Sequence, residues 1–70
     1  MEVNVDRLKT LRQLRAMSQQ ELSGVSGVGR ATISRIERGE SGAQGRTLRR
    51  LAKALGVGVE ELVKVGSDDD

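Results

Sequence analysis

The sequence predicts an all-α protein, a compact bundle of five short helices in a single domain. Apolar residues recur three and four positions apart in successive segments, which is the spacing of one helix face. The sequence contains nine glycines, several of which separate these segments, and no proline. Phe, Tyr and Trp are absent, so a thin core of aliphatic side chains must hold the 70 residues together, and a helical bundle can be built from such a core.

The composition excludes most kinds of enzyme. Cysteine and histidine are both absent, which removes disulfides, thiolate metal sites, thiol nucleophiles and the usual general base near neutral pH. We therefore expect no catalytic residue, no metal and no cofactor. No apolar run approaches about 18 residues and no charged-then-apolar leader precedes the first helix, so we expect no membrane span, no signal peptide and a cytoplasmic location.

Cap signals mark the first two helices. The first is expected over residues 4–16, with Asn4 as its N-cap. Three leucines would form its inward face, Leu8, Leu11 and Leu14. The second begins at Ser18, because Ser18 and Glu21 have the spacing of a capping box. The side chains expected to face inward from this helix are Leu22, Val25 and Ser26.

A tight turn leads into the third helix. Gly27 can adopt the left-handed conformation that such a turn needs. The third helix is expected from Arg30 to about Arg38, with Gly29 as its cap and Gly39 as its stop. Two isoleucines would share its buried side, Ile33 and Ile36. Small and basic side chains lie roughly opposite, at Ala31, Ser34, Arg35 and Arg38.

The rest of the chain predicts two further helices and a tail. Residues 40–45 have the composition of a loop, and the fourth helix is expected over residues 46–55. Its inward residues would be Leu48, Leu51, Ala52 and Leu55. A short last helix is expected over residues 59–64, with Gly58 as its cap. The domain would then occupy residues 1–65, and residues 66–70 would form a disordered acidic tail.

Charge is distributed unevenly along the chain. The formal net charge is only +2, but residues 30–53 hold seven basic residues against two acidic ones. Acidic residues gather instead near the end of the sequence, at Glu60, Glu61 and residues 68–70. A basic middle segment suits a polyanionic partner at one face of the molecule.

The segment from Ser18 to Gly39 resembles the helix-turn-helix of the phage-repressor and Xre/Cro family. The residues that carry the resemblance are Gln19, Ser23, Gly27, Val28, Ile33 and Ile36, and the match extends over about residues 5–64. Glu37 falls at the border of the buried side of its helix, where a carboxylate needs a cation. In the family pattern an arginine of the first helix pairs with this glutamate, which implies a structural ion pair between Arg12 and Glu37.

The resemblance implies that the chain binds double-stranded DNA with the third helix in the major groove. The residues expected to contact bases are Arg30, Ala31, Thr32, Ser34 and Arg35. The residues expected to contact the DNA backbone are Gln19, Gln20, Arg38, Arg46 and Arg49. On an arbitrary amphipathic helix, exposed arginines more often form a solvated face than a binding site. Within a helix-turn-helix, we expect DNA contact to be the more frequent role.

The function expected from these features is sequence-specific DNA binding by a transcriptional repressor or regulator. Family members usually act as dimers on pseudo-palindromic operators, so a homodimer through the last helix, with Val59, Val63 and Val65, is a candidate arrangement. Two alternatives remain open. The chain could be a protein-interaction module on the same fold, such as an antitoxin or bridging factor, or the DNA-binding part of a longer regulator.

Overall fold

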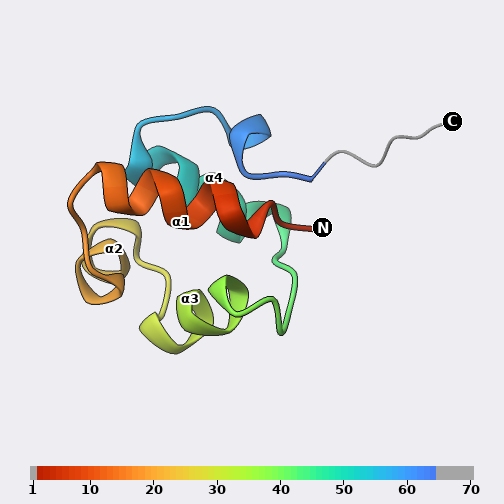
Figure 1. The fold of residues 1–70 in the computed structure, drawn as a ribbon, viewed down its shortest axis with the longest axis horizontal. Helices are drawn as coiled ribbons and strands as arrows, with labels where there is room; N and C mark the ends of the chain where they lie inside the picture. Colours follow the sequence, from red (N-terminus) through yellow and green to blue (C-terminus); the bar gives the residue numbers. More distant parts are fainter. Residues whose placement is uncertain (1, 65–70) are drawn as a thin grey trace, which may run out of the picture.

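The fold is an all-helical bundle of four α-helices and a final 3₁₀ turn. A computed structural model describes residues 2–64, in the order α1 (Val5–Leu14), α2 (Gln19–Ser26), α3 (Arg30–Glu37), α4 (Gly45–Leu55) and the 3₁₀ turn Val59–Glu61. Figure 1 shows α2 and α3 along one side of the molecule and α1 and α4 crossing the other. The prediction of a fifth helix over residues 59–64 is therefore wrong, because that segment forms only one 3₁₀ turn.

The predicted caps start the helices at the expected residues. The Asn4 Oδ1 atom accepts a hydrogen bond from the Arg7 N–H at 3.1 Å, which begins α1. Before α2, the Ser18 Oγ atom accepts from the Glu21 N–H at 3.0 Å, and the Glu21 carboxylate accepts from the Ser18 N–H at 2.8 Å. This reciprocal capping box fixes the first turn of α2.

The first helix ends earlier than predicted. Instead of continuing to Ala16, α1 stops at Leu14, and Ala16 adopts a left-handed conformation with φ of 55°. The Ala16 N–H donates to the Gln13 carbonyl, and the Met17 N–H donates to the Arg12 carbonyl, a pattern that usually has glycine at the left-handed position. The early reversal leaves Leu14 68% exposed, so its predicted inward orientation is wrong.

The turn between α2 and α3 forms as predicted. Gly27 has φ of 76°, Val28 is buried at the corner, and Gly29 precedes the first residue of α3. One side chain differs from expectation, because Val25 is 63% exposed. The inward face of α2 follows Gln19, Leu22, Ser23 and Ser26, a continuous helical stripe that excludes Val25.

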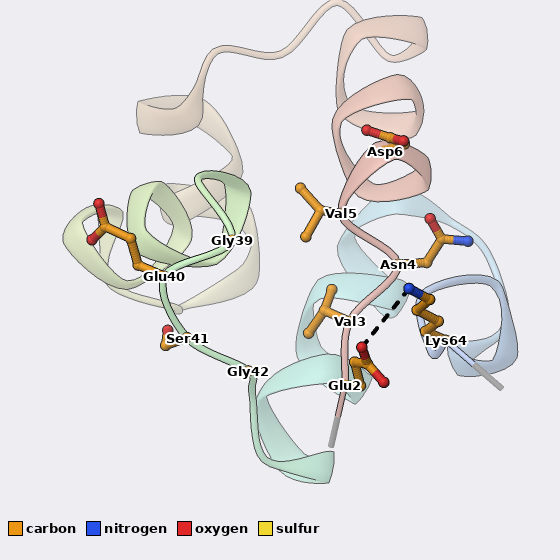
Figure 2. A pocket seen from close by; sticks show the side chains of 10 residues that line it. All are labelled: Glu2, Val3, Asn4, Val5, Asp6, Gly39, Glu40, Ser41, Gly42 and Lys64. Atoms are coloured by element: carbon orange, nitrogen blue, oxygen red, sulfur yellow. Dashed lines mark ion pairs between the residues drawn. The ribbon is translucent and has the colours of Figure 1, made fainter. Parts of the chain in front are cut away.

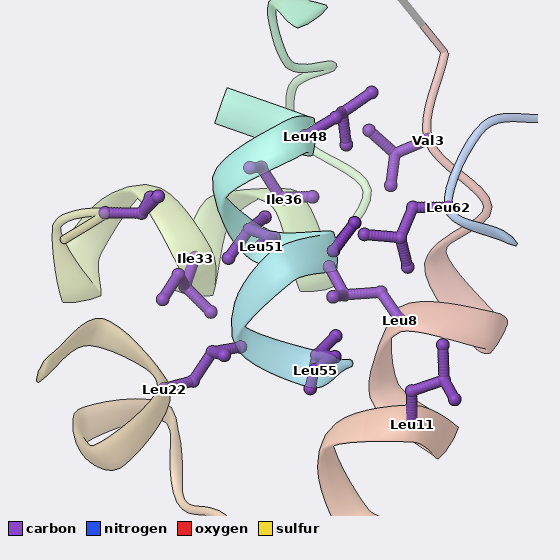
Figure 3. Packing of buried hydrophobic residues seen from close by; sticks show 12 residues of the cluster. Val3, Leu8, Leu11, Leu22, Ile33, Ile36, Leu48, Leu51, Leu55 and Leu62 are labelled. Atoms are coloured by element: carbon purple, nitrogen blue, oxygen red, sulfur yellow. The ribbon is translucent and has the colours of Figure 1, made fainter. Parts of the chain in front are cut away.

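The core is aliphatic and centred on α4. Figure 3 shows Leu48, Leu51 and Leu55 of α4 between the leucines of α1 and the side chains of α2 and α3. Twelve apolar residues are buried in one cluster: Val3, Leu8, Leu11, Leu22, Val28, Ile33, Ile36, Leu48, Leu51, Ala52, Leu55 and Leu62. The four inward residues predicted for α4 all belong to this cluster.

The two ends of the described chain lie together. Val3 and Val63 form an antiparallel bridge, the Asn4 N–H donates to the Leu62 carbonyl at 2.8 Å, and the Lys64 N–H donates to the Glu2 carbonyl at 3.0 Å. The predicted helix over residues 59–64 stops at Glu61 because the chain then extends to pair with residues 2–4. The predicted boundary at residue 65 and the predicted tail over residues 66–70 lie outside the described residues.

The left-handed conformation of Ala16 generates a stability prediction. The left-handed region costs a non-glycine residue about 1–2 kcal/mol, so Ala16→Gly should stabilise the protein by about 0.5–1 kcal/mol after the added entropy of the unfolded chain is subtracted. Urea unfolding of both proteins measures the difference.

Gly39 supplies the matched control for this prediction. It has φ of 74° and no atom within 4 Å of an added Cβ, so Gly39→Ala tests backbone conformation alone. This variant should be destabilised by about 1 kcal/mol. A destabilised Ala16→Gly protein would show that the turn after α1 tolerates alanine without strain.

Candidate nucleic-acid interface

A buried ion pair anchors the end of α3. The Arg12 guanidinium donates from Nε to Glu37 Oε2 at 2.7 Å and from its NH2 group to Glu37 Oε1 at 2.9 Å. The side chains of Arg12 and Glu37 are 14% and 4% exposed. The pair implied by the family resemblance is thus present, and it joins α1 to α3.

Two further hydrogen bonds extend this ion pair into a network. The Arg12 NH1 group donates to the Met17 carbonyl at 2.8 Å, and the Gln19 Nε2 atom donates to Glu37 Oε1 at 3.1 Å. The network therefore connects α1, the turn before α2, the first residue of α2 and the last residue of α3. The buried Glu37 carboxylate thus accepts three hydrogen bonds, two from Arg12 and one from Gln19. Because the acceptor is ionised, these bonds are stronger than bonds between neutral groups.

The electrostatics of the network keep Glu37 ionised. Burial alone would raise the pKa of Glu37, but the hydrogen bonds from Arg12 and Gln19 and the positive charge of Arg12 outweigh it, so the pKa lies below its ordinary value. The hydrogen bond to Glu37 raises the pKa of Arg12. Both groups are charged at neutral pH, as a stable buried pair requires.

The opposite side of α3 carries the residues predicted to contact bases. Burial of Ile33 and Ile36 turns Arg30, Ala31 and Arg35 outward, where they are exposed, while Thr32 and Ser34 are half-buried. A depression of about 400 Å³ lies along this side, and we call its lining residues the recognition surface: Gln19, Arg30, Ala31, Ser34, Arg35 and Arg38. Three arginines and no carboxylate line it.

The structure brings together some of the predicted DNA-contacting residues and separates others. Thr32 does not line the depression, although its hydroxyl lies 3.5 Å from the Arg35 NH2 group. Three predicted backbone-contacting residues lie elsewhere and are exposed: Gln20 on α2, and Arg46 and Arg49 on α4. Gln19 lines the depression while its amide remains bonded to Glu37.

The fourth helix adds a basic face of its own. The sequence of α4 contains no acidic residue. Its exposed side holds four basic residues, Arg46, Arg49, Arg50 and Lys53. The buried leucines of α4 lie on the other side of the same helix. This arrangement adds positive charge at the surface without placing any charge in the core.

A larger depression, of about 610 Å³, lies between the N-terminal segment and the loop before α4. Figure 2 shows its lining, which comes from residues 2–6, residues 39–42 and Lys64. Its lining includes the acidic residues Glu2 and Asp6 and the single basic residue Lys64, while the carboxylate of the third acidic lining residue, Glu40, points away to Arg38. A polyanion would be repelled from such a site, so the smaller depression on α3 is the candidate interface.

Residues 2–64 contain neither a candidate membrane span nor a candidate metal site. No helix in this part of the chain is both long and apolar enough to cross a membrane. Nor does the same part contain a group of three or more histidine, cysteine, aspartate or glutamate side chains that could hold a metal ion.

Comparison with known proteins identifies the family. A helix-turn-helix family model, HTH_3, matches residues 8–62 of the chain. The chain belongs to the HTH_3 family. A search of curated proteins finds no match to it.

Two solved structures resemble this HTH_3 chain closely. The restriction-modification controller protein C.AhdI from Aeromonas hydrophila is 32% identical, with a TM-score of 0.78 over 81% of this chain and 86% of that one. An HTH_3 family transcriptional regulator from Vibrio cholerae is 33% identical, with a TM-score of 0.77 over 81% of this chain. The match spans only 32% of the Vibrio cholerae protein. The family and both structures support a function in DNA-binding transcription regulation.

One residue of this HTH_3 site was not found from the sequence. Glu40 lies just past α3, and its carboxylate accepts hydrogen bonds from Arg38 at 2.8 and 3.2 Å. The signal available in the sequence was the order Arg38, Gly39, Glu40, because a left-handed glycine after a helix folds the next residue back beside the last turn.

The buried network predicts a large effect of removing one charge. Glu37→Gln should lower the free energy of unfolding at pH 7 by about 3–5 kcal/mol, because Arg12 would remain buried without a counter-charge. Glu61→Gln is the matched control, since Glu61 pairs with Arg7 at 2.7 Å but both side chains are about 40% exposed. The control should lose no more than about 1 kcal/mol. Equal losses in urea unfolding would contradict this assignment.

The same pair predicts how stability depends on pH. The pKa of Glu37 is lower in the folded protein than its ordinary value of 4.5, so ionised Glu37 stabilises the fold fully above that value. This stabilisation should be lost as the pH falls through the folded pKa. The difference in unfolding free energy between the parent and Glu37→Gln should therefore be constant near neutrality and shrink below about pH 4.5. A free-energy difference that grows on acidification would contradict a lowered pKa of Glu37 in the folded protein.

Proposed function

We propose that this HTH_3 protein binds a specific site on double-stranded DNA as a transcriptional repressor or regulator, with α3 in the major groove. The observation that carries the proposal is the recognition surface, where three arginines line a depression on a helix whose other side is fixed in the core. A rigid helix of this kind places its outward side chains against base edges.

The chemistry of these side chains assigns their proposed roles. Arg30 and Arg35 can each donate two hydrogen bonds to guanine, which is worth about 1–3 kcal/mol of discrimination against another base. Ala31 can make apolar contact with a thymine methyl group, and the hydroxyl groups of Ser34 and Thr32 can bond to base edges.

The DNA backbone would be held from two other helices. Gln19 and Gln20 occupy the first turn of α2, where the N–H groups have no partner within the helix and favour a phosphate. Arg46 and Arg49 would bind phosphates from α4. Such contacts position the protein without reading sequence.

A homodimer on a pseudo-palindromic operator completes the proposal, together with a cytoplasmic location. Two recognition helices would then lie about 34 Å apart, one turn of DNA. Val59 and Val63, which the sequence offered as a dimer surface, pack partly against the core of the same chain, and Val65 lies outside the described residues. The dimer surface would therefore have to use the sides of Val59 and Val63 that the core leaves exposed.

The proposal is tested by selecting a random duplex DNA library with the purified chain at about 150 mM salt, where non-specific phosphate binding is weak. We expect enrichment of an inverted repeat. Enrichment of a single half-site would indicate a monomer, as expected for the DNA-binding part of a longer regulator. No enrichment by folded protein would reject the proposal and favour a protein-interaction module.

Two arginine variants separate base reading from backbone binding. Arg35→Ala should change the selected base at one position of each half-site, because a base contact is lost. Arg49→Ala should weaken binding to all duplexes alike and reduce the slope of log affinity against log salt by about 0.9, because one phosphate contact is lost. Titrations of the selected and a scrambled duplex over a salt series measure both effects. If both variants changed base preference and salt dependence alike, the proposed division between a base-contacting Arg35 and a phosphate-contacting Arg49 would be wrong.

A further inference from the structure

The end of α3 places one carboxylate beside the recognition surface. Gly39, with φ of 74°, donates its N–H to the Ile36 carbonyl at 3.0 Å, and the Glu40 N–H donates to the Arg35 carbonyl at 3.0 Å. These two hydrogen bonds fold the chain back onto the last turn of α3. In Figure 2 the Glu40 side chain points away from the N-terminal segment, on the side of α3.

The carboxylate of Glu40 holds Arg38 from one side, and Ser34 holds it from another. Arg38 Nε donates to Glu40 Oε2 at 2.8 Å and its NH2 group donates to Oε1 at 3.2 Å. Its NH1 group donates to the Ser34 Oγ atom at 2.7 Å. A guanidinium group has five N–H donors, so two remain available on Arg38 for a ligand at the recognition surface.

We propose that Glu40 is a positioning residue that sets DNA specificity, by clamping Arg38 against Ser34 in one orientation. The proposal rests on the DNA-binding function proposed above. It assigns Arg38 a fixed, directional contact with the preferred DNA site, whereas the sequence alone indicated a contact whose main effect is to neutralise a phosphate.

The first argument for this role is electrostatic. Glu40 accepts hydrogen bonds from Arg38, and these hold the pKa of its carboxyl below its ordinary value, so the residue is ionised at neutral pH. The Arg38–Glu40 pair then has no net charge. Non-specific affinity comes from cations that neutralise phosphates, so a neutral pair adds little to it.

The second argument concerns preorganisation. A free arginine side chain loses rotamer freedom when it binds, and it can follow a phosphate at many DNA sequences. The side chains of Arg38 and Glu40 are 56% and 53% exposed, but three of the Arg38 donors are bonded, so its two remaining N–H groups favour an acceptor in one place. A DNA site without an acceptor at that place gains nothing from Arg38. The clamp therefore lowers affinity for wrong sites more than affinity for the right one.

The test compares Glu40→Gln with the parent on two fluorescent duplexes, the one enriched by the parent and a scrambled duplex of the same composition. Releasing the charge of Arg38 should tighten binding to the scrambled duplex by about twofold to tenfold and steepen its salt slope by about 0.9. The ratio of the two affinities should fall by about threefold to tenfold. A residue with only a structural role would weaken binding to both duplexes.

Two further variants serve as controls. Glu60→Gln removes one exposed carboxylate from the 3₁₀ turn, and it should leave the affinity ratio unchanged although it alters the net charge equally. In an Arg38→Ala background, Glu40→Gln should no longer change the ratio, because there is no guanidinium to clamp. Thermal unfolding should show that each variant is folded.

The outcomes distinguish this proposal from the proposed function. An unchanged affinity ratio in Glu40→Gln, or a change that persists without Arg38, would overturn the role of Glu40 while leaving specific DNA binding intact. A parent protein that enriches no duplex would overturn both proposals. A lower ratio with tighter scrambled-duplex binding, seen only when Arg38 is present, would support the clamp.

Discussion

The position of α3 depends on the ion pair between Arg12 and Glu37. Glu37 is the only charged side chain found buried among the described residues, and it is located at the last residue of α3. An eight-residue helix is marginal by itself, so its stability must come from tertiary contacts. Ile33 and Ile36 supply these contacts through the core, and Glu37 supplies them through Arg12 and Gln19. Since the buried charge tolerates only one geometry, the ion pair also fixes how α3 is rotated against α1.

Because the rotation of α3 is fixed, its buried side and its exposed side affect different properties of the protein. Residues on the buried side determine stability, and residues on the exposed side are free of that constraint. Arg30, Ala31 and Arg35 are exposed and lie outside the buried cluster, so we expect changes at these positions to cost little folding free energy. The same separation holds on α4, where leucines face the core and basic residues face solvent. A thin aliphatic core can therefore support an interface rich in charge.

The sequence predicted the features that depend on local chemistry. Side-chain caps at Asn4 and Ser18 and the left-handed Gly27 act within a few residues, and α4 shows its inward face through spacing alone. The misses had two causes, which are contacts between distant segments and backbone conformations that the residue types do not signal. Nothing in the residues around Ala16 indicates a left-handed alanine, and the burial of Val3 requires its bridge to Val63. At the candidate site, the sequence located the arginines of α3 but not their partners, because hydrogen bonds from Arg38 to Glu40 depend on how the chain turns after the helix.

The arginines of this protein fall into two groups, and the difference bears on how a chain of formal charge +2 can bind a polyanion. Arg7, Arg12 and Arg38 each form an ion pair with a glutamate, so their charges are balanced locally. In the described part of the chain, Arg30 and the basic residues of α4 have no such partner. Attraction to phosphate depends on these unbalanced charges and not on the total. Balanced arginines offer hydrogen-bond donors in fixed positions instead, so under the proposed function affinity and orientation would be controlled by different residues of the same type.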